Sequence, residues 1–245
     1  METELAAELL SVEGVVGGYG KLTVLHGTSF KVARGAITTV IGPNGAGKST
    51  VFKAIFGLLP VTSGHIEFDG RDITNLDTRK RLELGLSYVP QGRNVFPELS
   101  VWHNLELGAT AVPAGVDVAA RIESLMARFP MLRRKARAQA STLSGGEQKL
   151  LEIARGLLLE PKLMLIDEPS IGLSPLLVKD IFGILQDLRA RGMSILMVEQ
   201  NAKRALEASD YGVVLELGRT RMEAPAAEIL ADRRVGQLFL GGALA

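Results

Sequence analysis

A glycine-rich segment near the start of the chain has the residue types needed to hold a phosphate group. Residues 42–50 read Gly-Pro-Asn-Gly-Ala-Gly-Lys-Ser-Thr, which matches the Walker A phosphate-loop spacing Gly-x-x-x-x-Gly-Lys-Ser. Glycine lets the backbone wrap an anion with its N–H groups pointing inward, and a following helix adds its positive N-terminal end. We expect Lys48 to reach the β- and γ-phosphates and Ser49 to bind Mg²⁺ through its hydroxyl. The residues expected to bind the nucleotide are Gly42, Pro43, Asn44, Gly45, Ala46, Gly47, Lys48, Ser49 and Thr50.

Two carboxylates follow a continuous apolar run, Leu-Met-Leu-Ile over residues 163–166. Such a run is typical of a strand buried on both faces, and it would deliver Asp167 and Glu168 to the carboxyl edge of a sheet, where open α/β sheets bind ligands. Asp167 is suited to holding Mg²⁺, directly or through water, and Glu168 to acting as the general base that polarises an attacking water. The alternative is an acidic turn that only caps a strand, and the phosphate loop favours the catalytic interpretation.

A second glycine-rich segment precedes a helical pattern. Ser144, Gly145 and Gly146 would present free backbone N–H groups and the positive end of a helix dipole to an anion. Taken alone, the segment is better explained as an N-cap serine followed by two loop glycines. A second phosphate-binding element is redundant unless it serves another nucleotide, which suggests a site shared between two chains.

The elements that must position these residues are predicted from hydrophobic periodicity and from glycine and proline breaks. The predicted strands are 9–16, 23–32, 37–41, 66–70, 86–89, 163–166 and 194–198, with a hairpin over 211–222 that turns at Gly218. We expect Gly17-Gly18 and Arg34-Gly35 to break the first two strands. The phosphate loop then lies between a strand and a helix, which is the context that it requires.

Helical spacing of apolar residues predicts a further set of elements. The predicted helices run from Ser49 to a stop at Gly57, and over 99–107, 118–129, 147–159 and 175–190. Pro161 ends the fourth of these, whereas Pro175 begins the fifth and Gly192 ends it. Residues 91–160 are therefore mostly helical, between two regions that are rich in strands. The last apolar segment, 235–240, carries no chemistry of its own.

Composition sets limits on the class of protein. The chain has 245 residues, enough for one α/β domain with a substantial core, and its net charge of +1 argues against nucleic-acid binding as the main role. It contains no cysteine, which excludes disulfides and thiolate metal sites. No stretch reaches the roughly 20 apolar residues needed to cross a bilayer, and the acidic N-terminus is not that of a secretion signal. We expect a soluble, cytoplasmic chain whose membrane role, if any, comes through a partner.

The three segments, in this order and spacing, resemble the ATP-binding subunit of ABC transporters, and the resemblance covers nearly the whole chain. It implies that Tyr19 stacks on adenine. It also implies that Gln91 approaches Mg²⁺ and water and links the ATP site to the membrane subunits. A core tyrosine and a solvated loop glutamine are the alternatives for these two residues. Residues 170–174 resemble the D-loop, which lies at the dimer seam in that family.

Residues 143–148 resemble the family's signature motif, which contacts the γ-phosphate held by the opposite subunit. By this resemblance Ser144, Gly145, Gly146 and Glu147 bind ATP, although Glu147 stands where the motif usually has glutamine. A second departure is the switch position after strand 194–198, which is usually histidine and here is Gln200. Glutamine can donate a hydrogen bond to a γ-phosphate but cannot carry a positive charge, so we expect catalysis to depend less on pH near neutrality.

The same departures are typical of one subfamily, the ATPases of branched-chain amino acid importers. Within it, the chain most resembles the shorter of the two paralogous ATPase subunits. The residues that carry this resemblance are Glu199-Gln200-Asn201, the segment Leu-Ser-Gly-Gly-Glu-Gln over 143–148, residues 91–97 and the ending Phe-Leu-Gly-Gly over 239–242. ATPases of urea and short-chain amide importers share much of this pattern and remain an alternative.

The resemblance implies a fold, a mechanism and partners. The fold is α/β, a P-loop NTPase (RecA-like) core with an antiparallel β subdomain and an inserted α-helical subdomain. We expect a single ATPase domain over 1–245, with the nucleotide-binding core over 1–90 and 160–245 and the helical subdomain over 91–159. ATP and Mg²⁺ are the cofactors, with Ser49, Gln91 and Asp167 near the metal and Lys48, Gln91, Glu168 and Gln200 catalytic. The partners are a second ATPase subunit, identical or different, two membrane permeases and, indirectly, a solute-binding protein, all at the inner face of the cell membrane.

Two alternatives from other classes remain at this point. A soluble ABC-type ATPase of translation or DNA repair usually carries two ATPase halves or a long coiled-coil insertion, and this chain has neither. A non-hydrolytic module that uses ATP only to dimerise is disfavoured by Asp167 and Glu168, although Gln200 leaves it open. The transported solute is not encoded in this chain, because specificity belongs to the permeases and the solute-binding protein.

Overall fold

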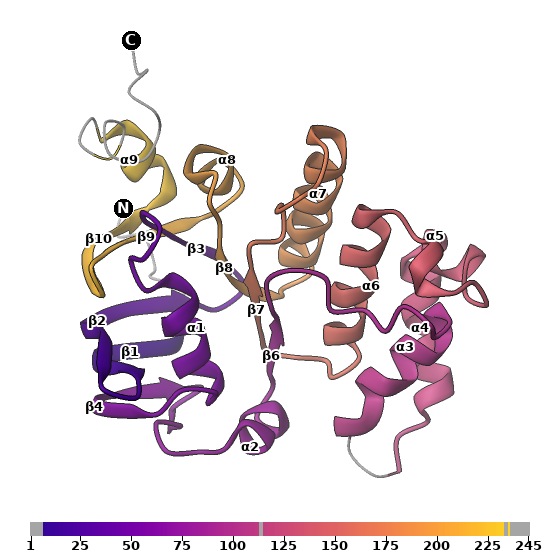
Figure 1. Cartoon of the computed structure of the whole chain (residues 1–245), viewed down its shortest axis with the longest axis horizontal. Helices are drawn as coiled ribbons and strands as arrows, with labels where there is room; N and C mark the ends of the chain where they lie inside the picture. Colours follow the sequence, from indigo (N-terminus) through magenta and orange to yellow (C-terminus); the bar gives the residue numbers. More distant parts are fainter. Residues whose placement is uncertain (1–6, 113–114, 233–234, 236–245) are drawn as a thin grey trace.

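Two β-sheets form the centre of the computed structural model, which describes residues 7–112, 115–232 and 235 (Figure 1). The smaller sheet is antiparallel, in the order β2-β1-β4-β5. Its strands are β1 (Glu8–Tyr19), β2 (Leu22–Ala33), β4 (Val61–Phe68) and β5 (Arg71–Asp72). It joins the larger sheet through the Thr28 hydroxyl, which donates to the carbonyl oxygen of Gly218 at 2.7 Å.

The larger sheet has the order β10-β9-β3-β8-β7-β6, and its strands are parallel except for β10 at one edge. They are β3 (Ile37–Ile41), β6 (Leu86–Val89), β7 (Leu163–Asp167), β8 (Ser194–Val198), β9 (Tyr211–Glu216) and β10 (Arg219–Pro225). Every residue of β3, β7 and β8 is buried, as continuous apolar runs predict for a central parallel sheet.

The helices surround this sheet. They are α1 (Lys48–Phe56), α2 (Thr78–Glu83), α3 (Val101–Gly108), α4 (Val118–Arg128), α5 (Pro130–Arg134), α6 (Gly145–Leu157), α7 (Pro175–Ala190), α8 (Ala202–Glu207) and α9 (Ala226–Ala231). Two short 3-10 turns, Ala109–Ala111 and Ala140–Thr142, complete the described elements. No helix among the described residues is long and apolar enough to cross a membrane.

Side-chain alternation along the central strands creates three layers. In β7, Leu163 and Leu165 pack with α1 and the antiparallel sheet, whereas Met164 and Ile166 pack with α6 and α7. Figure 1 shows α1 on one side of β7 and α6 and α7 on the other. The predicted fold is thus confirmed: an α/β core, an antiparallel region and a set of inserted helices.

The inserted helices lie beyond α6. Figure 1 shows α3, α4 and α5 at the end of the molecule farthest from the antiparallel sheet. The second half of α6 packs directly on the larger sheet, since a Cβ on Gly156 would lie 2.8 Å from the hydroxyl oxygen of Ser87. Helix α6 therefore belongs to both the inserted helices and the core, and the proposed domain boundaries stay a prediction.

Most predicted elements are confirmed, and one break is wrong. Strands β6 and β8 and helix α7 have the predicted bounds. Gly17-Gly18 does not interrupt β1 but lies inside it, where the register with β2 and β4 shifts. A Cβ on Gly18 would lie 1.9 Å from the carbonyl oxygen of Leu22, so glycine is needed for close pairing rather than for a turn. The ending 239–242, and segment 235–240 apart from the buried Val235, lie outside the described residues.

Candidate functional site

The phosphate loop connects β3 to α1, so it has the predicted strand-loop-helix context. Gly45 and Gly47 have φ values of +81° and +100°, in the left-handed region that favours glycine. A Cβ on Gly42 would lie 2.1 Å from the carbonyl oxygen of Leu215 in β9. The glycines therefore allow both the curvature of the loop and its close packing against the neighbouring strand.

Lys48 is the first residue of α1 and its side chain folds back over the loop. Its ammonium donates to the carbonyl oxygens of Gly42 at 2.8 Å and Pro43 at 3.1 Å. Burial lowers the pKa of Lys48, while the nearby Glu168 and Asp167 oppose that shift. The loop thus holds a buried cation at the start of α1, where it could neutralise the charge of a phosphate group.

Asp167 is the last residue of β7 and lies against the start of α1. The Ser49 hydroxyl donates to its Oδ1 at 3.2 Å and the Tyr88 hydroxyl donates to its Oδ2 at 3.3 Å. Burial raises the pKa of Asp167, and these two hydrogen bonds act in the opposite direction. A neighbouring hydroxyl and carboxylate are hard oxygen donors of the kind Mg²⁺ prefers, so the residues fit that ion.

The described residues contain no cluster of three or more His, Cys, Asp or Glu side chains that could hold a metal. Ser49 and Asp167 supply few oxygen ligands by themselves. Mg²⁺ bound with a nucleotide usually takes one or two protein ligands and completes its shell with phosphate oxygens and water. The sparse donor set therefore suits a metal that arrives with a nucleotide.

Glu168 follows Asp167 in an unusual backbone conformation. Its φ is +48°, a left-handed value that is uncommon for a residue with a side chain, and its N–H donates to the carbonyl oxygen of Val198 at 2.9 Å. The side-chain amide of Gln91 donates to Glu168 Oε2 at 2.8 Å. The structure thus brings together two of the predicted catalytic residues, which come from the ends of β6 and β7.

The loop that contains Gln91 is fastened to α6 by a network that the sequence analysis did not predict. Lys149 and Glu152 form a buried ion pair, 2.6 Å between Nζ and Oε2. Lys149 also donates to the carbonyl oxygen of Gly92 at 2.9 Å, and the Asn94 N–H donates to Glu152 Oε1 at 2.6 Å. An i,i+3 pair of opposite charges on an apolar helix face is a sequence signal that could have found it.

Two predicted nucleotide contacts lie at the rim of this region. Tyr19 ends β1 with an exposed ring, and Lys53 Nζ lies 5.4 Å from the ring centroid. An exposed aromatic face of this kind is available for stacking, so the ring is not the core tyrosine considered as the alternative. Gln200 follows β8 as an exposed residue, and its N–H donates to Glu199 at 3.1 Å.

The second glycine-rich segment forms the start of α6. Ser144 is its N-cap, with its hydroxyl 3.4 Å from the Glu147 N–H, while the Glu147 carboxylate accepts from the Ser144 N–H at 2.8 Å. Lys135 also donates to Glu147, at 2.7 Å. A Cβ on Gly146 would lie 2.8 Å from Leu177 in α7, so this glycine allows the two helices to pack closely.

The start of α6 is remote from the phosphate loop. Figure 1 shows α1 and α6 on opposite sides of β7, and no hydrogen bond among the described residues joins segment 143–148 to residues 42–50. The N-cap geometry is present, as the simpler interpretation requires. A phosphate held by this chain's own loop is nevertheless out of reach of Ser144, so an anion-binding role needs a second chain.

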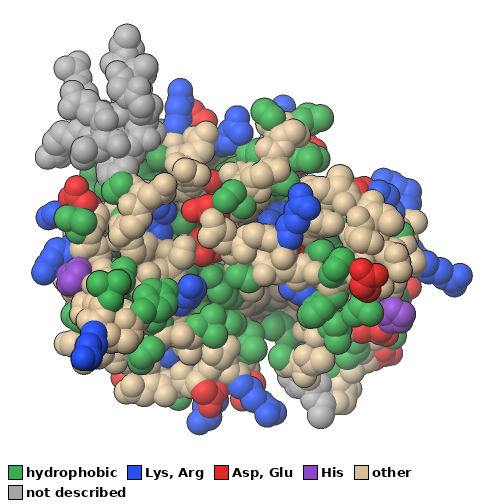
Figure 2. Space-filling model, viewed as in Figure 1, with side chains coloured by type: hydrophobic (Ala, Val, Ile, Leu, Met, Phe, Trp, Pro, Cys, Tyr) green, Lys and Arg blue, Asp and Glu red, His purple; other side chains and the backbone are tan. Residues whose placement is uncertain are grey.

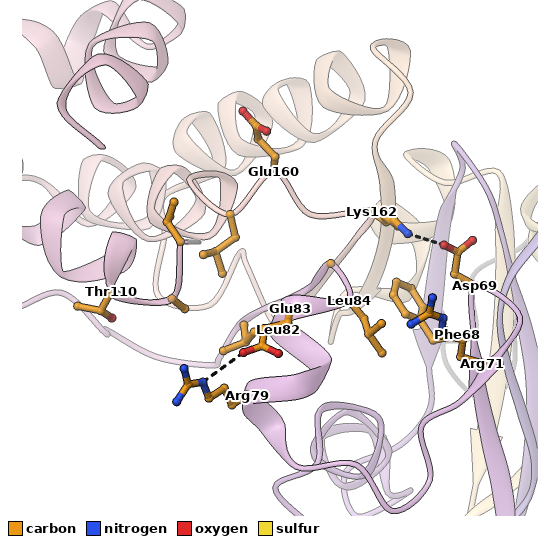
Figure 3. A pocket seen from close by; sticks show the side chains of 14 residues that line it. Phe68, Asp69, Arg71, Arg79, Leu82, Glu83, Leu84, Thr110, Glu160 and Lys162 are labelled. Carbon is orange, nitrogen blue, oxygen red and sulfur yellow. Dashed lines mark hydrogen bonds and ion pairs between the residues drawn. The ribbon is translucent and has the colours of Figure 1, made fainter. Parts of the chain in front are cut away.

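A cavity of about 1080 Å³ lies elsewhere, between the β4–β5 turn, α2 and the residues that precede β6 and β7 (Figure 3). Its charged side chains include two ion pairs, Lys162 with Asp69 and Arg79 with Glu83. The cavity is at the amino ends of β6 and β7, whereas Asp167 and Glu168 are at the carboxyl end. It is therefore separate from the candidate site.

The face of the molecule shown in Figure 2 carries charges of both signs. Figure 2 shows Lys and Arg side chains spread over the face in view and mixed with Asp and Glu, without a continuous basic surface on that face. This distribution agrees with a net charge of +1.

Comparisons with known proteins bear on this arrangement. The model of the ABC transporter family matches residues 25–171, more than half of the chain. BraG of Pseudomonas aeruginosa, a high-affinity branched-chain amino acid transport ATP-binding protein, is 39% identical over 96% of this chain and 100% of its own. LivF of Archaeoglobus fulgidus, a probable branched-chain amino acid transport ATP-binding protein, is 40% identical over 91% of this chain and 95% of its own.

Two further similarities complete the comparison. LptB of Escherichia coli K12, the ATP-binding protein of a lipopolysaccharide export system, is 32% identical over 95% of this chain and 97% of its own. A solved ATP-binding cassette of an ABC transporter superposes with a TM-score of 0.87 at 30% identity, covering 96% of this chain and 100% of that one.

Proposed function

The chain belongs to the ABC transporter ATP-binding family and is the ATPase subunit of a transporter, and we propose that it powers the import of branched-chain or related amino acids. Relatives that are named as transport ATP-binding proteins support this assignment over the two alternatives of other classes, a non-transport ATPase and a non-hydrolytic module. ATPase subunits of transporters work with membrane permeases, so permeases are its partners. The direction of transport and the solute are the parts that we propose.

The observation that supports import is the pattern of identity among relatives. The two relatives named for branched-chain amino acid transport are 39% and 40% identical to this chain, whereas LptB proteins of export systems are 32% and 34% identical over a similar length. The segment Glu199-Gln200-Asn201 at the switch supports the same assignment through the subfamily resemblance.

We further propose that ATP is bound by residues 42–50, with Tyr19 stacked on adenine. Ser49 and Asp167 hold Mg²⁺, which when bound neutralises charge on the β- and γ-phosphate oxygens. The Gln91–Glu168 hydrogen bond of 2.8 Å places both side chains at the end of β7, beside the proposed metal ligand Asp167. Gln91 would therefore approach the metal and the water from the end of β6.

In the proposed reaction, Glu168 accepts a proton from water as the water oxygen bonds to the γ-phosphorus. The bond from that phosphorus to the bridging oxygen breaks, which leaves ADP and inorganic phosphate. Lys48 and the side-chain amide of Gln200 donate hydrogen bonds to the γ-phosphate oxygens as charge develops on them.

The second ATPase subunit completes the site in this proposal. Because α6 lies across β7 from the phosphate loop, its first turn would face a nucleotide bound by a partner. The N–H groups of Ser144 and Glu147 are engaged with each other's side chains in the capping box, so Gly145 and Gly146 would offer backbone N–H groups and Ser144 its hydroxyl. The partner is a second copy of this chain or a related ATPase. Two permeases, served by a solute-binding protein, would hold the pair at the cytoplasmic face of the membrane, and closure on ATP would change their access.

The test of the site is ATP hydrolysis measured together with dimer mass. We expect turnover in the wild type with Mg²⁺, and an ATP-dependent dimer without turnover in Glu168→Gln. Glu207→Gln, which changes an exposed glutamate at the end of α8, is the matched control and should hydrolyse ATP at the wild-type rate. Hydrolysis near the wild-type rate in Glu168→Gln would refute the assigned base.

The test of the solute uses the assembled transporter in liposomes. The ATPase is co-purified with its permeases, and hydrolysis is measured with the solute-binding protein loaded with leucine, isoleucine or valine. We expect each amino acid to stimulate hydrolysis and to enter the liposomes. Stimulation by urea or a short-chain amide alone would overturn the amino-acid assignment, and a complex that binds no solute and moves lipid outward would overturn import.

A further inference from the structure

Glu199 is a buried carboxylate that the reaction above does not use. It directly follows β8 and precedes Gln200, and only 1% of its surface is exposed. Buried carboxylates are rare unless their oxygens have strong partners, because removing the charge from water is costly. None of the ion pairs formed by the described residues includes Glu199, so its partners must be hydrogen-bond donors.

Those donors come from two loops at the edge of the candidate site. Ser170 donates twice, through its N–H to Oε1 and through its hydroxyl to Oε2, each at 2.8 Å. Gln200 donates through its N–H to Oε2 at 3.1 Å. The Glu199 side chain therefore joins the loop after β7 to the loop after β8 with three hydrogen bonds to one charged group, which are stronger than bonds between neutral groups.

The connection continues the pairing of the two strands beyond the sheet. Asp167 pairs with Val198 as the last position in the parallel register, and the Glu168 N–H then donates to the Val198 carbonyl oxygen at 2.9 Å. Beyond this point the two loops are joined through a side chain: the Ser170 N–H donates to the Glu199 carboxylate instead of to a backbone carbonyl oxygen. The position of Gln200 is thus tied to that of Ser170.

The loop that contains Ser170 also reaches the surface. Ile171 is a large apolar side chain with 43% of its surface exposed, next to the anchored Ser170. Its N–H donates to the carbonyl oxygen of Glu168 at 3.3 Å, so this short turn connects the surface residue to the proposed base. The segment is therefore fixed to the site at both Glu168 and Glu199.

We propose that Glu199 is a positioning residue that couples the loop of Ser170 to Gln200, so that the loop after β7 sets the place of Gln200. This inference rests on the proposed function, since Gln200 matters only if ATP is hydrolysed between two chains. Glu199 touches neither nucleotide nor metal in this scheme and acts only through the two loops.

The test compares Glu199→Gln, Ser170→Ala and the double variant in an ATPase assay at several protein concentrations. Glu199→Gln keeps the size of the side chain but leaves one acceptor oxygen for two backbone N–H groups, and Ser170→Ala removes one donor. We expect each to lower kcat about tenfold, a loss equivalent to roughly one charged hydrogen bond, with KM for ATP within about twofold. Ser170→Thr, which keeps the hydroxyl, should restore most of the rate.

Two further readouts separate coupling from simple stabilisation. The double variant should be no slower than the worse single variant, because both changes break one connection. The protein concentration at which hydrolysis is half-maximal should also stay unchanged, since the dimer surface is intact. Ser124→Ala, an exposed serine on α4, is the matched control for the serine variants.

Additive losses in the double variant, or a lower Tm with unchanged kcat, would overturn the coupling. Failure of the proposed function is distinguishable from these results, because the wild-type chain itself would then show neither turnover nor an ATP-dependent dimer.

Discussion

Replacing Glu152 by methionine removes one member of the buried ion pair that fastens the loop of Gln91 to α6. The side chains of Lys149 and Glu152 are only 5% and 2% exposed. With Glu152 gone, the Lys149 ammonium keeps its bond to the Gly92 carbonyl oxygen but loses its counter-charge, and the Asn94 N–H loses its acceptor. Methionine has a similar volume, so the change is mainly electrostatic.

The size of the effect follows from the burial of the pair. Breaking a buried pair by removing one partner costs about 3–5 kcal/mol, because the remaining charge is left without compensation. Total stabilities of domains are only about 5–15 kcal/mol, so Glu152→Met and the matching variant Lys149→Met should each lose a large share of the free energy of unfolding.

Removing both charges should cost less than the sum of the single changes. In Lys149→Met/Glu152→Met no buried charge remains, and the losses are the hydrogen bonds of the Gly92 carbonyl and the Asn94 N–H. We expect a total of about 2–4 kcal/mol, against roughly 6–10 kcal/mol for the sum of the singles. The coupling energy between the two residues would then be at least about 2 kcal/mol.

The measurement is equilibrium unfolding in urea at pH 7 for the wild type, the two single variants and the double variant. Glu83→Met is the control, because its partner Arg79 is 87% exposed and that pair should contribute about 0.5 kcal/mol or less. Single variants that lose less than about 1 kcal/mol, or a double variant equal to the sum of the singles, would refute the reasoning.

Four further predictions concern single positions. Arg81 is almost fully buried and donates to four carbonyl oxygens, two of them in the last turn of α1, so Arg81→Met should lower stability by about 2–4 kcal/mol in urea unfolding. Gly47→Ala should abolish binding of a fluorescent ATP analogue, because φ is +100° and a Cβ would lie 3.1 Å from Leu25. A Cβ on Gly45 meets no atom within 4 Å, so Gly45→Ala should weaken binding of the analogue only about five- to tenfold. Tyr19→Ala should raise the Kd for ATP about three- to tenfold in calorimetry, while Tyr19→Phe keeps the ring and stays within about twofold. Burial raises the pKa of Asp167 above its ordinary 3.8, so its charge costs stability at neutral pH and that cost disappears as the pH falls toward 4. Asp167→Asn should therefore raise Tm at pH 7 and lose this advantage near pH 4. A difference in Tm that does not change with pH would contradict this.

Local sequence predicted the long elements and missed the short ones. Helix α7 has 16 residues with regular apolar spacing, and its bounds agree with the prediction. Helices α2, α5, α8 and α9 have five or six residues each, fewer than two turns, so no periodicity could reveal them. In α2 and α8 the start is set by a capping side chain, Asp77 or Asn201, which accepts from a backbone N–H.

The phosphate loop and the carboxylate pair could be predicted from the sequence because the conformation of each segment is set by residues next to it in the chain. Glycine at 45 and 47 permits left-handed backbone wherever the chain lies, and an apolar run before Asp167 predicts a buried strand in any sheet. The order of strands in the sheet is not determined by such local rules.

Only the tertiary structure decided which polar groups meet. Gln91 and Glu168 are 77 positions apart, and Tyr88 and Asp167 are 79 apart, yet each pair is joined by a hydrogen bond because β6 and β7 are parallel neighbours that end at one edge. Glu199 and Ser170 meet for the same reason at the ends of β7 and β8. The sequence by itself determined the backbone conformations and residue types of the site, since these depend on short-range sterics and burial. The partners of each buried charge depend on strand order and register, which the packing of the whole chain decides.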